Sequence, residues 1–347
     1  MKVISIVNQK GGCGKTTLSV NIAATLAKFG KNTLLIDLDP QAHATYALGY
    51  SRKAAEAKTS YDIFRAHLDE SEIALDDIIL RNRPNFSFIP SNMVLSTAEI
   101  NLGNVEGAAA ILSESLANYK GEDYEYVIID SPPSFGFLTL NSMYAADILL
   151  VPIDLSYFSF NAINSIYRVK GILNSETGKQ PEVFFVLNIF DGRSNFAMQL
   201  ERDVKARVGN FLMSTKIRSC VRLREASGLG KSIFEHDPKS QAALDFYNVT
   251  TELLEMGSRD MNLHVKEFLV SAPLASSVYV LGDFNGWKKT EVNKLTKFED
   301  GKWGGHFSLP KGRHRYKFLV DGNWMHDDSN PVLESNIFGS IDSVIEL

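Results

Sequence analysis

The chain has 347 residues, of which 44% are apolar and 22% are charged, and its net charge is −5. This composition is typical of a globular protein, and no apolar stretch approaches the roughly 20 residues of a membrane-spanning helix. The negative charge argues against a protein coated with nucleic acid. The two cysteines lack CxxC spacing, which argues against a disulfide framework and a zinc site and favours a reducing, cytoplasmic setting. The length suits two domains.

The first predicted elements are a strand, a glycine-rich loop and a helix. An apolar run at residues 3–7 leads into Asn-Gln-Lys-Gly-Gly-Cys-Gly-Lys-Thr-Thr at 8–17, and a helical pattern spans 18–29. Loops of this kind bind phosphate, because glycine lets successive backbone N–H groups face one anion and the helix N-terminus adds its dipole. The predicted phosphate-binding residues are Gly11, Gly12, Cys13, Gly14, Lys15, Thr16 and Thr17.

Three side chains of this segment differ in their expected roles. Lys15 is expected to neutralise the β- and γ-phosphates, and the Thr16 hydroxyl is expected to bind Mg²⁺. Lys10 precedes the first glycine and is too far from the phosphate cradle to duplicate Lys15. Its charge has no evident use in its own site, so we expect it to serve a nucleotide held by a second subunit.

Carboxylates follow two of the next predicted strands. The strand at residues 33–36 leads into Asp37 and Asp39, and the strand at 126–129 leads into Asp130. Because parallel strands present ligands at their carboxyl edge, the three carboxylates should converge on the glycine-rich loop. Asp37 and Asp130 are the predicted magnesium residues, and Asp39 is expected to orient an attacking water.

Up to about residue 256 the chain alternates apolar, β-branched runs with longer amphipathic segments. Further strands are predicted at residues 86–89, 148–151 and 183–187, and helices at 105–119, 161–173, 196–208 and 238–256. Apolar strands alternating with helices indicate a mostly parallel sheet that helices flank on both faces. Residues 1–257 are therefore predicted to form an α/β domain.

A basic segment lies within this otherwise acidic chain. Residues 202–231 contain eight Lys and Arg against two acidic residues, a local net charge of +6. Such a cluster is a candidate contact surface for a polyanion. A solvated face without a ligand is the alternative interpretation.

The pattern changes after residue 257. Short strands are predicted at residues 265–270, 278–282, 303–309, 314–320 and 344–347, with turns such as Asp-Phe-Asn-Gly between them. This spacing indicates a small antiparallel, immunoglobulin-like β-sandwich over residues 262–347. All three tryptophans fall in this part, and Trp303 is expected to belong to its core.

The motifs of the first part resemble one family. Lys-Gly-Gly-Cys-Gly-Lys-Thr-Thr from residue 10, Asp-Leu-Asp-Pro-Gln from residue 37 and Val-Ile-Ile-Asp-Ser-Pro-Pro-Ser from residue 127 resemble the deviant Walker ATPases of the ParA/MinD family, above all its chromosomal ParA (Soj-type) proteins. The likeness covers about residues 1–256. It implies a P-loop NTPase fold, ATP and Mg²⁺ as cofactors, and slow hydrolysis stimulated by a ParB-like partner.

The resemblance also implies an ATP-bound homodimer with the nucleotides sandwiched between subunits. In such a dimer Lys10 reaches the nucleotide of the partner, and Lys10, Lys15 and Asp39 act in catalysis. Asn188 corresponds to an adenine contact.

The resemblance further implies contact with DNA of any sequence. Arg193, Arg218 and Arg222 are the candidates for these contacts, and two of them lie in the basic segment. The implied function is the positioning or segregation of a cargo, such as a plasmid, a chromosome or a protein complex, over the nucleoid.

Two other branches of the family fit this chain less well. The MinD branch ends in an amphipathic membrane helix, whereas residues 343–347 are predicted to form a strand, so no membrane partner is expected. The iron–sulfur reductase branch needs two cysteines per subunit at its cluster. Cys13 lies in the phosphate loop and cannot serve there.

The C-terminal part resembles a different family. Val-Tyr-Val-Leu-Gly-Asp-Phe-Asn-Gly-Trp from residue 278 and Tyr-Lys-Phe-Leu-Val-Asp-Gly-Asn-Trp from residue 316 resemble the glycogen-binding module of AMP-activated kinase β-subunits. The resemblance implies that Trp287 and Trp324 stack on sugar rings and that Lys317 bonds to hydroxyls. Phe338 and Asp342 stand where that family has Leu and Asn. These departures leave open whether the module binds an α-glucan or a cargo protein.

An alternative function follows from this second resemblance. The chain would then be an α-glucan- or partner-binding scaffold, and its ATPase would only switch dimerisation.

Overall fold

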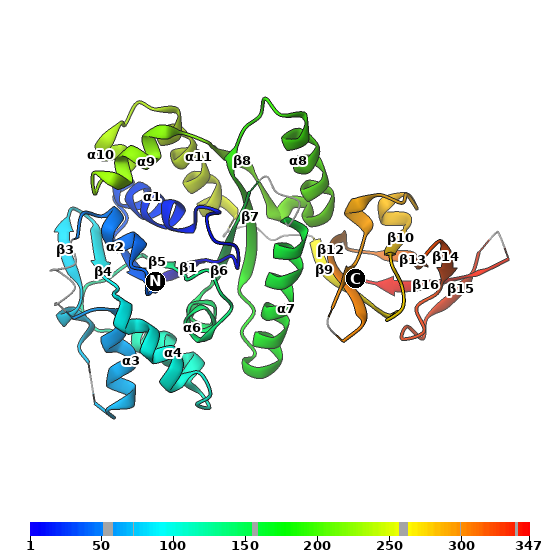
Figure 1. Cartoon of the computed structure of the whole chain (residues 1–347), viewed down its shortest axis with the longest axis horizontal. Helices are drawn as coiled ribbons and strands as arrows, with labels where there is room; N and C mark the ends of the chain where they lie inside the picture. The colour runs from blue at the N-terminus through cyan, green and yellow to red at the C-terminus, as the bar shows by residue number, and fades with distance from the viewer. Residues whose placement is uncertain (51–57, 72, 155–158, 257–262, 299, 337–338) are drawn as a thin grey trace. The chain divides into compact units, whose positions relative to one another are not determined.

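The computed structural model describes residues 1–50, 58–71, 73–154, 159–256, 263–298, 300–336 and 339–347 (Figure 1). Its contacts define two compact units. The first comprises Met1–Leu155, Val169–Arg193 and Met213–Arg259, and the second comprises Ser156–Arg168, Ser194–Leu212 and Asp260–Leu347. Within the described ranges, no helix has the length and apolar character that a membrane crossing requires.

An eight-stranded sheet organises the N-terminal part, in the order β3-β4-β2-β5-β1-β6-β7-β8. Its strands are β1 (Lys2–Ile6), β2 (Thr33–Asp37), β3 (Leu80–Arg83), β4 (Phe86–Ile89), β5 (Tyr126–Asp130), β6 (Ile148–Ile153), β7 (Glu182–Phe190) and β8 (Leu212–Arg218). The pairs from β4 to β7 are parallel, and β3 runs antiparallel to β4. The predicted α/β class with a mostly parallel sheet is confirmed.

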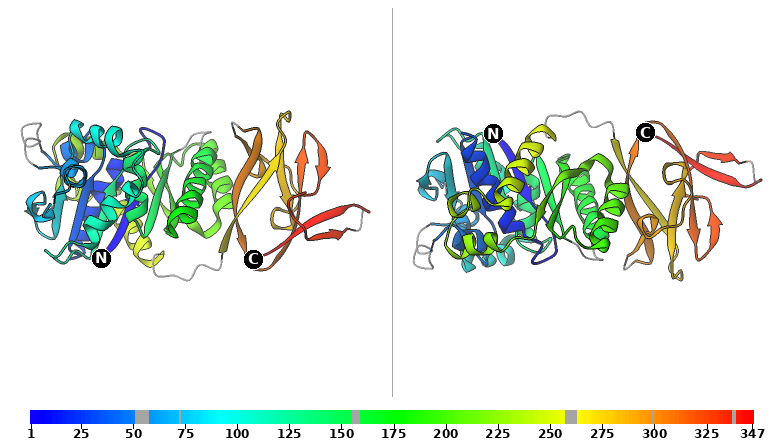
Figure 2. Two further views of the ribbon diagram at one scale, coloured as in Figure 1. Left: turned by 90° about the horizontal axis from the view of Figure 1, so that it is seen from below. Right: turned by 90° about the horizontal axis from the view of Figure 1, so that it is seen from above.

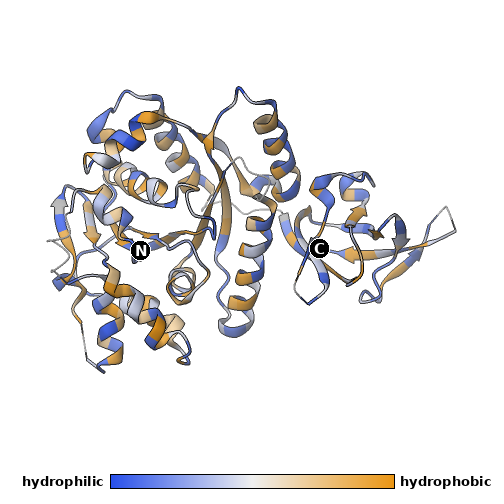
Figure 3. Cartoon of the chain, viewed as in Figure 1, coloured by the Kyte–Doolittle hydropathy of each residue, from blue (hydrophilic) through white to orange (hydrophobic). Residues whose placement is uncertain are grey.

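Helices lie on both faces of this sheet, as Figures 1 and 2 show for those of the first unit, and Figure 3 shows β7 coloured mostly as hydrophobic. One face carries α1 (Lys15–Lys28), α9 (Val221–Gly228), α10 (Ile233–His236) and α11 (Gln241–Met256). The other carries α3 (Ser60–Leu68), α4 (Ser96–Leu102), α5 (Ile111–Ala117) and α6 (Phe137–Ala145). The short α2 (His43–Ala47) follows β2, and α7 (Ser159–Thr177) runs through residues of both units.

Two predicted helix starts were too early. The helix expected from residue 105 begins at Ile111, because Gly107 has a left-handed φ of 78° and residues 108–110 form a 3₁₀ turn. The helix expected from residue 238 begins at Gln241. There Ser240 closes a turn onto the carbonyl of Asp237 and its Oγ accepts from the N–H of Ala243 at 3.2 Å, a capping contact that starts the helix.

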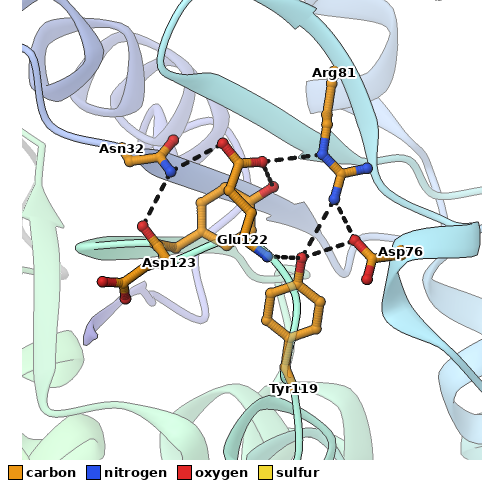
Figure 4. A network of polar contacts seen from close by, with 7 residues as sticks. Asn32, Asp76, Arg81, Tyr119, Glu122 and Asp123 are labelled. Carbon is orange, nitrogen blue, oxygen red and sulfur yellow. Dashed lines mark hydrogen bonds and ion pairs between the residues drawn. The ribbon is translucent and has the colours of Figure 1, made fainter.

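A polar network fixes β2 beside β5 at their amino ends (Figure 4). The side-chain amide of Asn32, just before β2, donates to Glu122 Oε1 at 3.0 Å, and Arg81 of β3 donates its Nε to Glu122 Oε2 at 3.0 Å. With the two strands fixed in this parallel register, Asp37 lies opposite Asp130 at the other, carboxyl edge.

The second unit contains a β-sandwich, as predicted. Its strands are antiparallel: β9 (Leu263–Ser271), β10 (Val278–Gly282), β11 (Thr296–Lys297), β12 (Lys302–Pro310), β13 (Arg313–Val320), β14 (Asn323–Met325), β15 (Leu333–Ser335) and β16 (Ile341–Glu346). One sheet has the order β10-β13-β16-β15 with β14 beside β13, and the other has β11-β12-β9. Apolar and aromatic side chains fill the core, Trp303 among them, as expected.

The second unit also buries the positively charged side chain of an arginine on α8 (Asn195–Val208). The Arg207 side chain is 1% exposed and donates to the carbonyl of Val292 at 2.7 Å and to Asn164 Oδ1 at 3.0 Å. Its guanidinium lies 3.5 Å from the ring centroid of Phe307. In the described part of the chain no carboxylate pairs with it, and burial lowers the pKa of Arg207 to about 9. Two hydrogen bonds and an aromatic ring therefore stabilise this guanidinium.

Candidate active site

The glycine-rich loop connects β1 to α1 at the carboxyl edge of the sheet. Gly12 and Gly14 have φ of 77° and 89°, values that glycine adopts without strain. A Cβ atom on Gly14 would lie 2.2 Å from Asn188 Nδ2, so a larger residue there would displace the Asn188 side chain. Lys15 opens α1, and its Nζ donates to the carbonyl of Lys10 at 3.1 Å. The backbone has the curled form that a phosphate cradle requires.

Asn188 fastens this loop to the sheet. It lies on β7, is buried, and donates from Nδ2 to the carbonyl of Cys13 at 2.7 Å. The side chain also lines the pocket beside the loop. Positioning of the loop is thus a role that sequence reasoning missed, and the adenine contact stays a prediction.

The predicted carboxylates do converge beside the loop. Asp37 and Asp130 are fully buried at the ends of β2 and β5. Asp39, two residues after Asp37, is also buried. Thr16 Oγ1 donates to Asp130 Oδ2 at 2.8 Å. A hydroxyl of the loop and the two strand-end carboxylates therefore lie together, as the sequence predicts for a magnesium site.

Burial changes the acidity of this carboxylate pair. It raises the pKa of Asp37 well above its ordinary value, and the neighbouring charge of Asp130 adds to the effect. Burial likewise raises the pKa of Asp130 to about 6, although hydroxyl groups of Thr16 and Ser19 donate to it. Two close carboxylates that are taken out of water favour a proton or a bound cation.

The oxygen atoms of Thr16, Asp37 and Asp130 suit Mg²⁺ when phosphate and water supply its remaining ligands. Neither Asp37 nor Asp130 forms an ion pair with a Lys or Arg among the described residues, and hard oxygen donors are those that Mg²⁺ prefers. The described part of the chain contains no group of three or more His, Cys, Asp or Glu side chains that could hold a metal ion. A Mg²⁺ ion held by Thr16 and these carboxylates would therefore take further ligands from phosphate and water.

A pocket of about 560 Å³ opens next to the loop, a volume in the range of small-molecule sites. Lys15, Thr16, Asp39 and other polar residues line it. Apolar contacts come from Leu223 and from Ile189, which has a strained left-handed φ of 54°. The lining thus combines polar groups suited to phosphates with apolar groups suited to a base. Sequence reasoning also missed Gln41, His43, Tyr46 and Arg224, which line it as well.

Lys10 has a partner within its own subunit, which corrects the premise that its charge has no use there. Its Nζ forms an ion pair with Asp154, just after β6, and its backbone N–H donates to Asn8 Oδ1 at 2.9 Å. Contact with a nucleotide of a second subunit would require Lys10 to leave Asp154. The contact between subunits stays a prediction.

Of the three arginines predicted to contact DNA, Arg218 lies at the nucleotide pocket. It comes at the end of β8, lines the pocket beside the glycine-rich loop, and forms an ion pair with the buried Asp245. The structure therefore brings Arg218 together with the phosphate-loop residues.

The other two predicted arginines are paired on the surface. Arg193 donates its Nη2 to Asp191 Oδ2 at 2.7 Å, and Arg222 donates its Nη1 to Glu225 Oε2 at 2.8 Å. Both side chains are more than half exposed, so surface ion pairs of this kind exchange easily with other anions.

The second unit brings together most of the residues predicted to bind carbohydrate. The rings of Trp287 and Trp324 have centroids 6.1 Å apart, and these residues are 37% and 51% exposed. Lys317 is buried, with its Nζ 3.2 Å from Asp342 Oδ1 and 2.6 Å from Ser340 Oγ. A pocket of about 660 Å³ is bordered by both tryptophans and by Lys317, Ser340 and Asp342. Phe338, the remaining candidate, lies outside the described residues.

Together, the glycine-rich loop, the parallel sheet and the strand-end carboxylates define a P-loop nucleotide-binding protein. Residues 1–180 match the model of a family described as an AAA domain. The sporulation initiation inhibitor protein Soj of Bacillus subtilis is 34% identical over 257 residues, which cover 74% of this chain and 99% of Soj. The chromosome partitioning protein ParA of Caulobacter vibrioides is 33% identical over 259 residues, 73% of this chain and 94% of that protein. The chain belongs to the ParA/MinD family of P-loop ATPases.

Solved structures and a second family model extend this comparison. The cobyrinic acid a,c-diamide synthase of Mycobacterium smegmatis, solved with an ATP analogue and magnesium, has a TM-score of 0.62 and 25% identity, covering 74% of this chain and 95% of its own. Its ligands are those that the sequence predicts here. Residues 273–347 match a family described as the glycogen recognition site of AMP-activated protein kinase.

Proposed function

We propose that this protein is a ParA-type ATPase that cycles between an ATP-bound homodimer and a monomer, and so positions or segregates a cargo over the nucleoid. The observation that carries the proposal is the convergence of the glycine-rich loop, the buried Asp37–Asp130 pair and Asp39 at one edge of the sheet. Relatives named for chromosome partitioning support it. A ParB-like partner would stimulate hydrolysis, and the cargo would bind elsewhere on the chain.

Each site residue has a defined task in this proposal. The loop backbone and Lys15 would bind the phosphates, and Asp39 would orient the attacking water. Thr16, Asp37 and Asp130 would hold Mg²⁺. Bound Mg²⁺ supplies neutralisation of the charge on the phosphate oxygens.

Lys10 would join the site of a second subunit. Its ion pair with Asp154 is partly exposed to solvent, and pairs of this kind stabilise by only about 0–1 kcal/mol. Exchange of Asp154 for a nucleotide phosphate is therefore energetically accessible. We assign the ATPase domain to residues 1–257 and the β-sandwich domain to residues 262–347.

The DNA-binding part of this proposal is tested by charge reversal. Arg222→Glu should lower DNA affinity about tenfold, equally for all sequences, and reduce the slope of log affinity against log salt by about one, because a phosphate contact releases counterions. Arg193→Glu should act in the same way. Fluorescence anisotropy with duplexes of several sequences, with and without ATP, measures both quantities.

The control is Arg65→Glu on α3, because Arg65 is as exposed as Arg222 and also forms ion pairs within its helix. An equal loss of affinity for Arg65→Glu would indicate a general charge effect. Equal DNA affinity with and without ATP would contradict a surface assembled by the ATP-bound dimer.

A second candidate function, α-glucan binding, is favoured by the exposed pair of tryptophans. A planar ring offers apolar area to the C–H face of a sugar, and Lys317 and Asp342 offer a donor and an acceptor beside it. We propose that this pocket binds α-1,4-glucans weakly. Lys317 already pairs with Asp342, so the sugar would have to compete for its N–H groups.

Trp324→Ala should weaken glucan binding at least about tenfold, by analogy with the roughly 1–3 kcal/mol of base–aromatic stacking. Affinity electrophoresis of the full-length protein in glycogen gels measures the effect. Met325→Ala is the matched control, since Met325 is the next residue of β14 and is 40% exposed. If the parent protein is not retarded by glycogen, the sandwich belongs to the protein-binding class instead.

A further inference from the structure

His43 lies beside the carboxylate that is expected to orient the attacking water. It is the first residue of α2, and its Nδ1 lies 3.8 Å from Asp39 Oδ2. The His43 side chain is 64% exposed, whereas that of Asp39 is nearly buried. Both residues line the pocket that also contains Lys15 and Thr16. The imidazole is thus the more exposed of the two groups, and it lies in the same pocket as the phosphate-loop residues.

The chain between the two residues holds them in this arrangement. Asp39 Oδ1 accepts from the N–H of Gln41 at 2.9 Å, and the N–H of Ala42 donates to the carbonyl of Asp39 at 2.8 Å. Ala42 has a left-handed φ of 55°, a conformation that alanine adopts only under constraint. This turn directs the chain back on itself, so Oδ2 of Asp39 faces the imidazole of His43.

The separation of the two groups has a specific chemical meaning. A distance of 3.8 Å is too long for a direct hydrogen bond between Nδ1 and Oδ2. It is short enough for one water molecule to bond to both atoms, and polar groups at such distances are commonly bridged in this way. A water held there would have its orientation fixed by two protein groups.

We propose that His43 is a second positioning residue for the attacking water, and that it acts together with Asp39. This inference rests on the proposed ATP hydrolysis. In that step the water oxygen bonds to the γ-phosphorus, the bond from phosphorus to the bridging oxygen breaks, and ADP leaves. The released phosphate keeps both hydrogens of the water until solvent takes the excess proton. His43 and Asp39 fix the direction of approach, and neither is consumed.

The test compares His43→Ala with the parent protein in turnover and in nucleotide binding. We expect kcat to fall about 10- to 100-fold, because the water loses one of its two anchors. KM for ATP and the affinity for magnesium and a non-hydrolysable ATP analogue should stay within twofold. The ATP-bound dimer should persist longer, which light scattering after ATP addition measures independently of phosphate release.

Two further variants sharpen this test. His43→Gln retains a hydrogen-bonding group and should recover part of the lost kcat. Combining His43→Ala with Asp39→Ala should lower kcat no further than Asp39→Ala alone, because the two residues act on one water. His67→Ala, which removes an exposed histidine from α3, is the control and should leave turnover unchanged.

Several results would overturn the inference. Turnover of His43→Ala at the parent rate would show that the water does not need this side chain. Weaker binding of the ATP analogue with unchanged ADP binding would place the imidazole on the γ-phosphate instead. A drop in melting temperature shared by His43→Ala and His43→Gln would assign it a structural role. If the parent protein hydrolyses no ATP, with DNA or without it, the proposed function itself fails.

Discussion

Asp39→Ala should bind ATP as tightly as the parent protein and hydrolyse it at least about 100-fold more slowly, because a correctly placed water supplies a large part of the catalysis of phosphoryl transfer. The residue is suited to this task. Its carboxylate is buried beside the phosphate loop, and its orientation is fixed by the N–H of Gln41. Loss of its charge breaks no ion pair with a Lys or Arg, since Asp39 forms none in the described residues.

The variant should accumulate as an ATP-bound dimer, measured by light scattering, while phosphate release gives the rate. Asp39→Asn is the matched comparison, because it keeps the shape and the hydrogen bond to Gln41 and loses the charge. Lys15→Ala should behave differently and fail to bind nucleotide at all. Hydrolysis by Asp39→Ala at the parent rate would refute the water-positioning role.

Asp130→Asn should stabilise the nucleotide-free protein at pH 7 by about 1–3 kcal/mol, because burial raises the pKa of Asp130. The folded protein holds this proton up to about pH 6, whereas the unfolded chain releases it near its ordinary value. The folded state therefore binds more protons between about pH 4 and pH 6, and its stability falls as the pH rises through that window. Asparagine is neutral at every pH, so the Asp130→Asn variant does not lose stability as the pH rises through that window.

Urea unfolding at several pH values measures this effect. The gain should be full at pH 7 and should vanish below about pH 4, where both states of the parent protein are protonated. Asp123→Asn, on the exposed turn before β5, is the control and should show no such gain. The same Asp130→Asn variant should bind ATP with little dependence on magnesium. Lower stability than the parent at pH 7 would contradict the burial argument.

The phosphate loop and its carboxylates were predictable because their chemistry lies in short contiguous motifs. The glycines and the strand ends before Asp37 and Asp130 are visible in the sequence, and a parallel sheet brings strand ends together. His43 was missed although it lies four residues after Asp39, because its approach to the carboxylate depends on the left-handed turn at Ala42. Alanine gives no sequence signal for that conformation.

Contacts between distant segments explain the other features that the sequence did not predict. The partner of Lys10 is Asp154, which lies 144 residues along the chain and is joined to it only through the order of β1 and β6 in the sheet. The family resemblance implies that Arg218 contacts DNA, which stays a prediction, whereas its place beside the nucleotide pocket depends on where β8 ends. Charge and spacing predict which residues matter, whereas the tertiary fold decides what each of them faces.

The burial of Arg207 has a consequence for synthesis on the ribosome. Its partners Val292 and Phe307 lie in the β-sandwich and are made 85 and 100 residues later. Because synthesis adds about 5–20 residues per second, α8 stays uncovered for roughly 5–20 s until these residues have been made. A guanidinium is well solvated during that interval, whereas a leucine at this position would expose its apolar side chain to water. The charge of Arg207 therefore stays hydrated until the C-terminal strands that bury it have been made.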